Sequence, residues 1–199
     1  MTQYLEKKYV QKNSIEKRDY QVNLATQAIK ENCIVVLPTG LGKTAIALHV
    51  MAEYLSKGIG GVLFLAPTRV LVNQHYEFLK NNLTLDDISL ITGEDTIQKR
   101  TKLWNNSVIC ATPEIARNDL DRGIVTPDQF ALVIFDEVHR TVGDYAYSGI
   151  AQRFEDSSAR ILGMTATLPS EKEKATEILT RLKIASVAER TEDSLDVKP

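Results

Sequence analysis

Two short segments carry residues whose types and spacing suit phosphate chemistry. The first spans residues 38–44 and reads PTGLGKT. Glycines let backbone N–H groups approach phosphate oxygens, and a helix that begins here adds its positive N-terminal end. A lysine can then reach the β- and γ-phosphates, while a threonine hydroxyl binds Mg²⁺. We therefore predict a nucleotide site that contains Thr39, Gly40, Leu41, Gly42, Lys43 and Thr44.

The second segment spans residues 136–139, reads DEVH, and directly follows an apolar run. Adjacent carboxylates at the tip of a strand point in different directions, so one can hold Mg²⁺ while the other orients and deprotonates water. We assign Asp136 to the metal and Glu137 to the water. An N-cap followed by a first-turn acid explains the pair equally well in isolation. Together with Lys43 and Thr44, however, the pair favours hydrolysis of ATP with Mg²⁺ as cofactor.

Short apolar runs alternate with helical patterns along the whole chain. The predicted strands cover residues 33–37, 62–66, 88–91, 107–110, 132–135, 160–164 and 186–188. These runs are almost continuously apolar, which is typical of strands covered on both faces. Strand–helix–strand units repeated in this way predict a mostly parallel sheet of about seven strands with helices on both faces. The chemistry should then lie at the carboxyl ends of the strands.

Helices are expected where apolar residues recur with a period near 3.6. One such face combines Leu71, Val72, His75, Phe78 and Leu79. Another helix should follow the phosphate loop, over about residues 45–56. The last helix is predicted to open with a capping box from Ser170 to Glu173.

The composition describes an ordinary globular chain of 199 residues, with 43% hydrophobic and 25% charged residues. This length suits one large domain, and its apolar runs are too short to span a membrane. We divide the chain into a leader over residues 1–17, an α/β domain over 18–189 and a tail over 190–199. Cys33 and Cys110 lie inside apolar runs, so we predict buried free thiols in a reducing compartment.

Charge gives little indication of a partner, because 24 Lys and Arg residues face 26 Asp and Glu residues. The first 18 residues are nevertheless rich in lysine and arginine. A solvated leader is favoured there over an arm that tracks phosphates. Glu6, Lys7 and Lys8 stand where a signal peptide needs an apolar stretch, which argues against secretion.

The order of these and further segments resembles the first motor domain of a superfamily 2 helicase. The segments are RDYQ at residues 18–21, PTGLGKT at 38–44, APTR at 66–69, TG at 92–93, ATPE at 111–114, DEVH at 136–139 and TAT at 165–167. The resemblance implies a RecA-like three-layer fold and ATP as ligand. It also implies that Gln21 pairs with the adenine edge while Arg18 packs against the ring. Leu37 replaces the glycine of the strict phosphate-loop pattern, as is typical of helicase motors.

A narrower resemblance comes from DEVHR at residues 136–140, GDYAY at 143–147 and the tail from Arg190. These segments are similar to those of archaeal Hef proteins and the Fanconi anaemia M-type DNA translocases. Val138 replaces the usual alanine, a size increase that packing should absorb. Thr167 stands where Hef proteins often have serine, which keeps the hydroxyl.

The resemblance also implies that a nucleic-acid backbone crosses the top of the sheet. We expect contacts from Thr68, Arg69, Thr92, Gly93, Thr112 and Pro113. Thr68 and Arg69 lie where a strand becomes a helix, Thr92-Gly93 forms a turn with exposed N–H groups, and Pro113 suits a first helical position. Ordinary roles as caps, turns and surface residues compete with this reading. Backbone contacts carry no sequence information, and at a net charge of −2 binding should be weak and salt-sensitive.

Several residues keep two readings. Trp104, Tyr145 and Tyr147 could stack on bases, although packing is more common for such aromatics. Arg140 could contact a neighbouring motor domain or pair with Asp144. His139 lacks partners at metal-ligand spacing, so we do not expect zinc. The resemblance gives His139, Thr165 and Thr167 a role in coupling nucleotide state to movement.

We thus expect a DNA-dependent ATPase, the ATP-binding part of a helicase or translocase that remodels branched DNA such as stalled forks. Its expected partners are forked DNA, and a helical insert and second RecA-like domain of the same parent polypeptide, but no membrane. The 199 residues alone should turn over little ATP, because the second domain supplies an arginine finger. Expected locations are the cytoplasm of an archaeal-type cell or a eukaryotic nucleus. Alternatives are an RNA motor of the RIG-I-like or Dicer kind and a non-hydrolysing, nucleotide-gated binding module.

Overall fold

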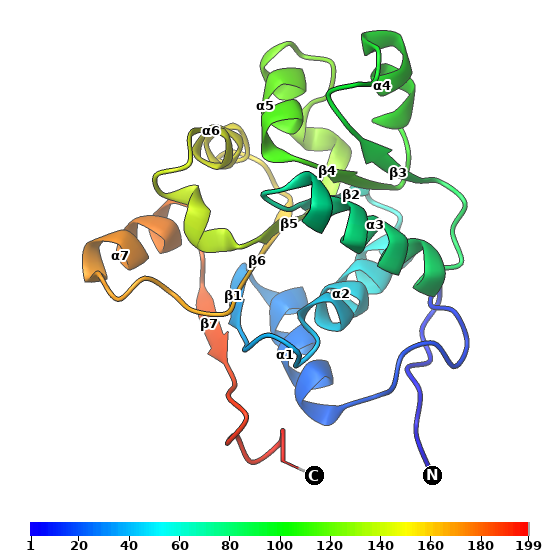
Figure 1. The fold of residues 1–199 in the computed structure, drawn as a ribbon, viewed down its shortest axis with the longest axis vertical. Helices are drawn as coiled ribbons and strands as arrows, with labels where there is room; N and C mark the ends of the chain where they lie inside the picture. Colours follow the sequence, from blue (N-terminus) through cyan, green and yellow to red (C-terminus); the bar gives the residue numbers. More distant parts are fainter. Residues whose placement is uncertain (199) are drawn as a thin grey trace.

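A single seven-stranded sheet organises the computed structural model, which describes residues 1–198 (Figure 1). Its strand order is β3-β4-β2-β5-β6-β1-β7, and every neighbouring pair is parallel. The strands are β1 (Cys33–Val36), β2 (Gly61–Leu65), β3 (Ile88–Ile91), β4 (Val108–Ala111), β5 (Phe130–Asp136), β6 (Arg160–Thr165) and β7 (Ser186–Glu189). All seven predicted strands are present within two residues of their expected bounds, which confirms the predicted α/β sheet.

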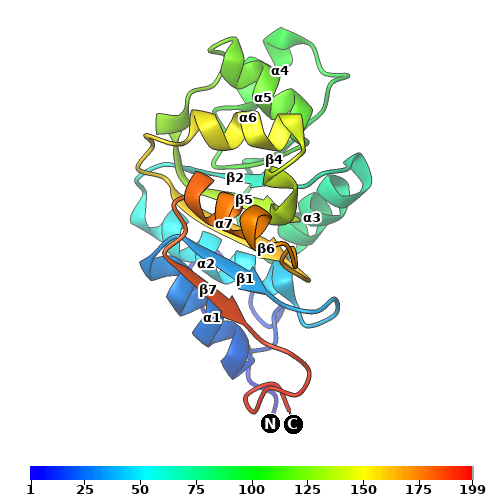
Figure 2. The same ribbon diagram turned by 90° about the vertical axis from the view of Figure 1, so that its left-hand side faces the viewer.

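Helices cover both faces of this sheet (Figure 2). They are α1 (Asp19–Lys30), α2 (Lys43–Lys57), α3 (Arg69–Asn82), α4 (Ile97–Leu103), α5 (Pro113–Asp121), α6 (Tyr145–Arg153) and α7 (Lys172–Arg181). One core lies between the sheet and α1, α2 and α3, and a second core lies between the opposite face and α5, α6 and α7. Within the described part of the chain, no helix is both long and apolar enough to cross a membrane.

The two cores explain why the strands are apolar at nearly every position. In β1, Cys33 and Val35 belong to the core under α1 and α2, whereas Ile34 and Val36 belong to the opposite core. Successive side chains of a strand point to opposite faces, so both sets must be apolar when both faces are covered. Cys33 and Cys110 are buried free thiols, as predicted, and burial raises the pKa of each.

The first 17 residues lie against the body of the domain rather than in solvent. Leu5, Val10 and Ile15 are buried in the core that α1, α2 and α3 cover. Val10 forms an antiparallel bridge with Leu83 at the end of α3. The reading as a solvated leader is therefore wrong for the apolar residues, although most of the basic side chains are exposed. Three apolar residues spaced five apart match neither helix nor strand periodicity, so pattern reasoning overlooked them.

Two details near the C-terminus differ from expectation. Helix α7 begins at Lys172 with Glu171 as N-cap, and no side chain caps it. The predicted capping box from Ser170 to Glu173 is therefore wrong, because the helix begins later than that box requires. Beyond β7, the Arg190 guanidinium pairs with Asp196 at 2.9 Å, and the tail closes into a compact turn.

A buried histidine beneath the N-terminal segment generates a prediction about acid stability. His49 on α2 is 1% exposed, and its Nε2 has no hydrogen-bond partner among the described residues. Burial, followed by the charges of Lys7 and Lys17, lowers the pKa of His49 to about 4. The imidazole of His49 therefore binds a proton more tightly in the unfolded chain than in the folded chain. The free energy of unfolding is consequently at its full value above pH 6.5 and decreases as the pH falls below that value.

When the pH falls from 7 to 5, protonation of His49 in the unfolded chain should lower the free energy of unfolding of the wild type by about 2 kcal/mol. The variant His49→Leu should show a correspondingly smaller loss over the same interval, because it has no group to protonate. Urea denaturation at pH 7, 6 and 5 measures both slopes. Equal slopes for the two proteins would contradict a buried neutral imidazole.

Candidate nucleotide and nucleic-acid site

The parallel sheet brings the carboxyl ends of all its strands to one edge, and the predicted site residues follow those ends. The phosphate loop follows β1, the DEVH segment follows β5, and Thr165 ends β6. These three strands are neighbours in the order β5-β6-β1. The segments expected to contact nucleic acid follow β3, β4 and β2, which are neighbours on the other side of β5. The predicted nucleotide residues and the predicted nucleic-acid residues thus lie on two sides of this edge, which we call the nucleotide half and the nucleic-acid half.

The phosphate loop adopts a conformation that depends on its glycines. Gly40 and Gly42 have φ angles of 92° and 86°, in the left-handed region that favours glycine. Helix α2 begins at Lys43, and neither a side-chain cap nor an acidic first-turn residue occupies its N-terminus. Its first backbone N–H groups therefore remain available to an anion. Next to the loop, the Leu37 N–H donates to the Thr165 carbonyl at 3.0 Å, which joins β1 to the end of β6.

The predicted adenine motif lies directly beside this loop. Gln21 is buried, and its Nε2 donates to the Leu41 carbonyl at 3.1 Å. The Tyr20 hydroxyl donates to the same carbonyl at 2.7 Å. Gln21 thus supports the loop, and its contact with the base stays a prediction. Arg18 lies at the N-terminus of α1, where its exposed guanidinium pairs with Glu16 at 3.3 Å.

The two predicted magnesium ligands, Thr44 and Asp136, converge on a single histidine. His75 Nε2 lies 2.7 Å from Asp136 Oδ2, and His75 Nδ1 lies 3.4 Å from Thr44 Oγ1. The other carboxylate oxygen, Asp136 Oδ1, accepts the Glu137 N–H at 3.0 Å. A hydroxyl and a carboxylate are the oxygen donors that Mg²⁺ prefers, and a carboxylate can also hold this ion through its water shell, so the chemistry of these residues fits Mg²⁺. Sequence reasoning missed His75, which it counted only as one position of a helix face.

Glu137 has an unusual backbone conformation. Its φ of 54° places it in the left-handed region, which is uncommon for residues other than glycine. Such conformations cost of order 1–3 kcal/mol and cluster at functional sites. The Glu137 carboxylate lies beside His139, whose Nδ1 is 3.6 Å from Glu137 Oε2.

The residues predicted to couple nucleotide state to movement form one hydrogen-bonded chain. His139 Nδ1 lies 3.1 Å from the Thr165 hydroxyl. That hydroxyl donates to the Thr167 carbonyl at 2.8 Å and accepts the Thr167 N–H at 3.3 Å. Because the hydroxyl proton of Thr165 is used on Thr167, His139 must donate in its own contact with Thr165. The chain runs from the tip of β5 to the loop after β6.

The aromatic residues for which the sequence leaves stacking and packing as alternatives divide into two groups. Tyr147 is fully buried, packs against Phe135, and donates its hydroxyl to the Asp136 carbonyl at 2.6 Å. Burial and then the charge of Asp136 raise the pKa of Tyr147, so it stays a donor. Trp104 is also buried. The packing reading is confirmed for both, whereas Tyr145 is 74% exposed and stacks on Arg117.

Arg140 lies in the short helical turn after the DEVH segment, and its side chain is exposed. Of the two readings, pairing with Asp144 is wrong for the residues that the structure describes. The Asp144 carboxylate instead caps α6 by accepting the N–H groups of Ala146 and Tyr147. The exposed Arg140 remains a candidate contact for a neighbouring domain.

The nucleic-acid half contains the predicted residues at two helix starts. Thr68 is the N-cap of α3, and its hydroxyl accepts the Leu71 N–H at 3.2 Å. Arg69 is exposed and pairs with Glu94 at 2.9 Å across the neighbouring turn. Pro113 occupies the first turn of α5, as predicted, and the Thr112 hydroxyl makes no capping bond. The hydroxyl of Thr112 is therefore not engaged in a cap, unlike that of Thr68.

A buried ion pair connects the Thr92-Gly93 turn to α5. Asp95 Oδ2 accepts the Thr92 N–H at 3.0 Å, so the expectation of a free amide at Thr92 is wrong. The Arg100 guanidinium donates to the Asp95 carbonyl at 2.6 Å and to Asp119 at 2.8 Å. Asp119 is fully buried and also accepts the Trp104 indole N–H at 2.8 Å. The turn after β3 and the helix after β4 are thus held together through one carboxylate.

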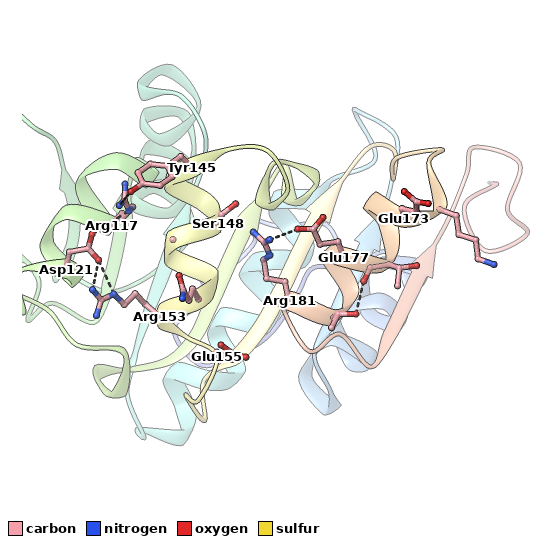
Figure 3. Close-up of a pocket in the computed structure, with 14 residues that line it drawn as sticks. Arg117, Asp121, Tyr145, Ser148, Arg153, Glu155, Glu173, Glu177 and Arg181 are labelled. Atoms are coloured by element: carbon pink, nitrogen blue, oxygen red, sulfur yellow. Dashed lines mark hydrogen bonds and ion pairs between the residues drawn. The ribbon is translucent and has the colours of Figure 1, made fainter.

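A groove between α5, α6 and α7 lies apart from these residues (Figure 3). Its volume is about 1410 Å³, and none of the predicted site residues lines it. Most of its labelled charges are already paired: Arg153 and Arg117 with Asp121, and Arg181 with Glu177 (Figure 3). The groove therefore presents no concentration of one charge.

The unusual Val138 fits because of a glycine on the neighbouring strand. Val138 is fully buried, and its Cγ2 would lie 2.7 Å from a Cβ placed on Gly163 of β6. The same Cβ would lie 3.1 Å from Ile34 Cγ1. The absence of a side chain at Gly163 thus provides the space that the larger residue at position 138 needs.

Comparisons with known proteins agree with this arrangement. The profile of the DEAD/DEAH box helicase family matches residues 18–175. The helicase domain of Hef from Pyrococcus furiosus superposes with a TM-score of 0.87 at 39% identity, over 91% of this chain and 40% of that chain. This likeness confirms the RecA-like fold.

Curated relatives include MJ1505 of Methanocaldococcus jannaschii, which is named as an ATP-dependent RNA helicase and is 43% identical over 98% of this chain. The ATP-dependent DNA helicase MPH1 of Candida albicans is 39% identical over 96% of this chain. This chain spans 25% of the first relative and 16% of the second.

The contact between Val138 and Gly163 yields a prediction about packing. Gly163→Ala should lower the free energy of unfolding by about 1–3 kcal/mol, because the new methyl group overpacks the core against Val138. In a Val138→Ala background the same change should cost less, since the Cγ2 atom that it meets is gone. Urea denaturation of the two single variants and the double variant measures the coupling. Additive effects would show that the two sites do not compete for space.

Proposed function

Because the chain belongs to the DEAD/DEAH box helicase family, we propose that it is the ATP-binding first motor domain of a DNA helicase or translocase that remodels branched DNA. The observation that carries the proposal is the convergence of Thr44 and Asp136 on His75, which joins the phosphate loop to the acidic tip of β5. A loop for phosphates and a carboxylate for Mg²⁺ are useful only when both reach the same nucleotide. Their proximity across neighbouring parts of the sheet edge supports an ATP site.

Each residue of the nucleotide half has a proposed role. Bound ATP and Mg²⁺ supply the reactive γ-phosphoryl group and the charge that neutralises it. Lys43 contacts the β- and γ-phosphates, and the backbone from Thr39 to Gly42 surrounds them. Thr44 and Asp136 hold the ion, while Glu137 orients the attacking water and accepts its proton.

The adenine motif and the coupling chain complete this half. Gln21 reads the base edge and Arg18 packs against the ring, next to the loop that Gln21 already supports. His139, Thr165 and Thr167 transmit the state of the γ-phosphate from Glu137 towards a second motor domain. The exposed Arg140 at the same edge is placed to meet that domain.

The nucleic-acid half holds one strand of DNA by its backbone. Thr68, Arg69, Gly93, Thr112 and Pro113 contribute contacts at the ends of β2, β3 and β4. The N–H and the hydroxyl of Thr92 both donate to Asp95, so Thr92 must exchange one of these bonds to donate to a phosphate. Such contacts are independent of sequence, as a moving motor requires. We propose forked DNA as the substrate and a helical insert plus a second RecA-like domain of the parent polypeptide as partners. The proposed cellular location is the compartment that contains DNA, which is the cytoplasm of an archaeal-type cell or the nucleus of a eukaryotic cell.

An RNA motor is the second candidate, because MJ1505 is named as an RNA helicase whereas the MPH1 proteins are named as DNA helicases. The resemblance of residues 143–147 to Hef and Fanconi anaemia M-type proteins favours DNA. A non-hydrolysing binding module is the third candidate. It is opposed by the complete set of Lys43, Asp136 and Glu137 and by the left-handed turn at Glu137.

Two substitutions separate binding from hydrolysis. Lys43→Ala should weaken binding of Mg²⁺–ATP by about 10- to 100-fold, because a charge-assisted contact with phosphate is lost. Lys57→Ala, which removes a lysine from the last turn of the same helix, is the matched control.

Glu137→Gln in the parent polypeptide should keep ATP affinity but lower turnover by about 10²- to 10⁴-fold. Calorimetric titration measures the affinity for Mg²⁺–ATP, and phosphate release measures turnover. Unchanged affinity in Lys43→Ala refutes the phosphate role of Lys43. Unchanged turnover in Glu137→Gln favours the non-hydrolysing binding module.

A third measurement concerns the second motor domain and the nucleic acid. Residues 1–199 alone should show little ATP turnover with or without forked DNA, because an arginine finger supplied by a partner domain contributes about 10³- to 10⁵-fold. Strong stimulation of the isolated chain by DNA would show that no second domain is needed. In the parent polypeptide, forked DNA should stimulate turnover more than double-stranded RNA does, and the reverse result would select the RNA motor.

A further inference from the structure

We propose that His75 is a positioning residue for magnesium, which orients the Thr44 hydroxyl and the Asp136 carboxylate through one hydrogen bond to each. The proposal rests on the proposed function and adds a residue to the same site. His75 belongs to α3, whereas the two ligands belong to the start of α2 and the end of β5. No short sequence motif joins the three residues.

The contacts of His75 determine how it acts. Its Nε2 lies 2.7 Å from Asp136 Oδ2, and this carboxylate oxygen can only accept, so Nε2 carries a proton. A neutral ring protonated at Nε2 is an acceptor at Nδ1, which lies 3.4 Å from the Thr44 hydroxyl oxygen. Thr44 then donates its hydroxyl proton to the ring. Its oxygen lone pairs are left for a cation, as a ligand to Mg²⁺ needs.

The ring itself is held in place by its surroundings. The His75 side chain is 12% exposed, and its ring centroid lies 4.6 Å from that of Phe64 on β2. The Asp136 carboxylate is 6% exposed, and its other oxygen is fixed by the Glu137 N–H. Few rotamers of either side chain therefore remain accessible. Partners of this kind, which touch ligands rather than the metal, typically change metal affinity by about 10- to 100-fold when removed.

A purely structural role is the competing explanation for a half-buried histidine on a helix face. Such a role predicts ring nitrogens bonded to backbone carbonyls or to ordinary core side chains. Both ring nitrogens of His75 instead meet the two residues assigned to magnesium. The same helix begins at Thr68 and Arg69, so His75 also connects the nucleic-acid half of the edge to the nucleotide half.

The test measures the dependence of ATP binding on magnesium rather than turnover. A fluorescent ATP analogue is titrated into the 199-residue chain in excess Mg²⁺ and in EDTA, and the ratio of the two dissociation constants is determined. His75→Ala should reduce this ratio by about tenfold or more, with affinity in EDTA unchanged. His75→Gln should recover most of the ratio, because its amide can donate to Asp136 and accept from Thr44. Glu77→Gln, an exposed change on the same helix, should leave the ratio unaltered.

The outcomes separate this inference from the proposed function. A wild-type ratio that survives in His75→Ala, or equal loss of affinity with and without magnesium, overturns the positioning role but leaves the ATP site intact. An absence of any magnesium-dependent binding in the wild type overturns the proposed function itself. Thermal melting of each variant checks that it folds. If His75→Ala does not fold, His75→Gln is compared with Asp136→Ala instead. A ratio in His75→Gln as low as that in Asp136→Ala decides against the inference.

Discussion

The structure depends on one constraint: seven neighbouring strands run parallel, so every loop that leaves a strand tip emerges on the same edge. Strand order then decides which loops meet. Because β5 lies between β2 and β6, the acidic segment after β5 borders the Thr165–Thr167 loop after β6 on one side and the Thr68 helix start on the other. The phosphate loop after β1 lies one strand beyond β6. The residues proposed for catalysis and those proposed for nucleic-acid contact therefore meet at one boundary, which lies at Asp136.

Helix α3 crosses that boundary. It begins beside residues predicted to contact nucleic acid and carries His75 to the carboxylate at the tip of β5. Tyr147 fixes the same strand tip from the opposite face of the sheet, through the Asp136 carbonyl. Asp136 is thus fixed by side chains from both covering layers, while Glu137, the next residue, has a left-handed backbone and a carboxylate beside His139. This division matches the different tasks proposed for the two carboxylates.

The sequence was sufficient to predict the strands and the local motifs, because both depend on neighbours in the chain. Continuous apolar runs located β1 to β7, and glycine spacing located the phosphate loop. It was insufficient for contacts between distant residues. His75 meets Thr44 and Asp136 across 31 and 61 positions, and its place on an apolar helix face concealed it. The packing of Leu5, Val10 and Ile15, and the use of the Thr92 amide by Asp95, also depend on tertiary structure.

The buried carboxylate of Asp119 couples the movements of two segments that are distant in the sequence. Arg100 and Trp104 both donate to it from beside the Thr92-Gly93 turn, and Asp119 itself belongs to the helix that begins at Pro113. Breaking such a pair exposes an uncompensated charge to a low-dielectric interior, which costs about 3–5 kcal/mol. A displacement of either the Thr92-Gly93 turn or the start of α5 therefore strains the other through this carboxylate. If these loops contact nucleic acid as proposed, a force on one of them is transmitted to the other through Asp119.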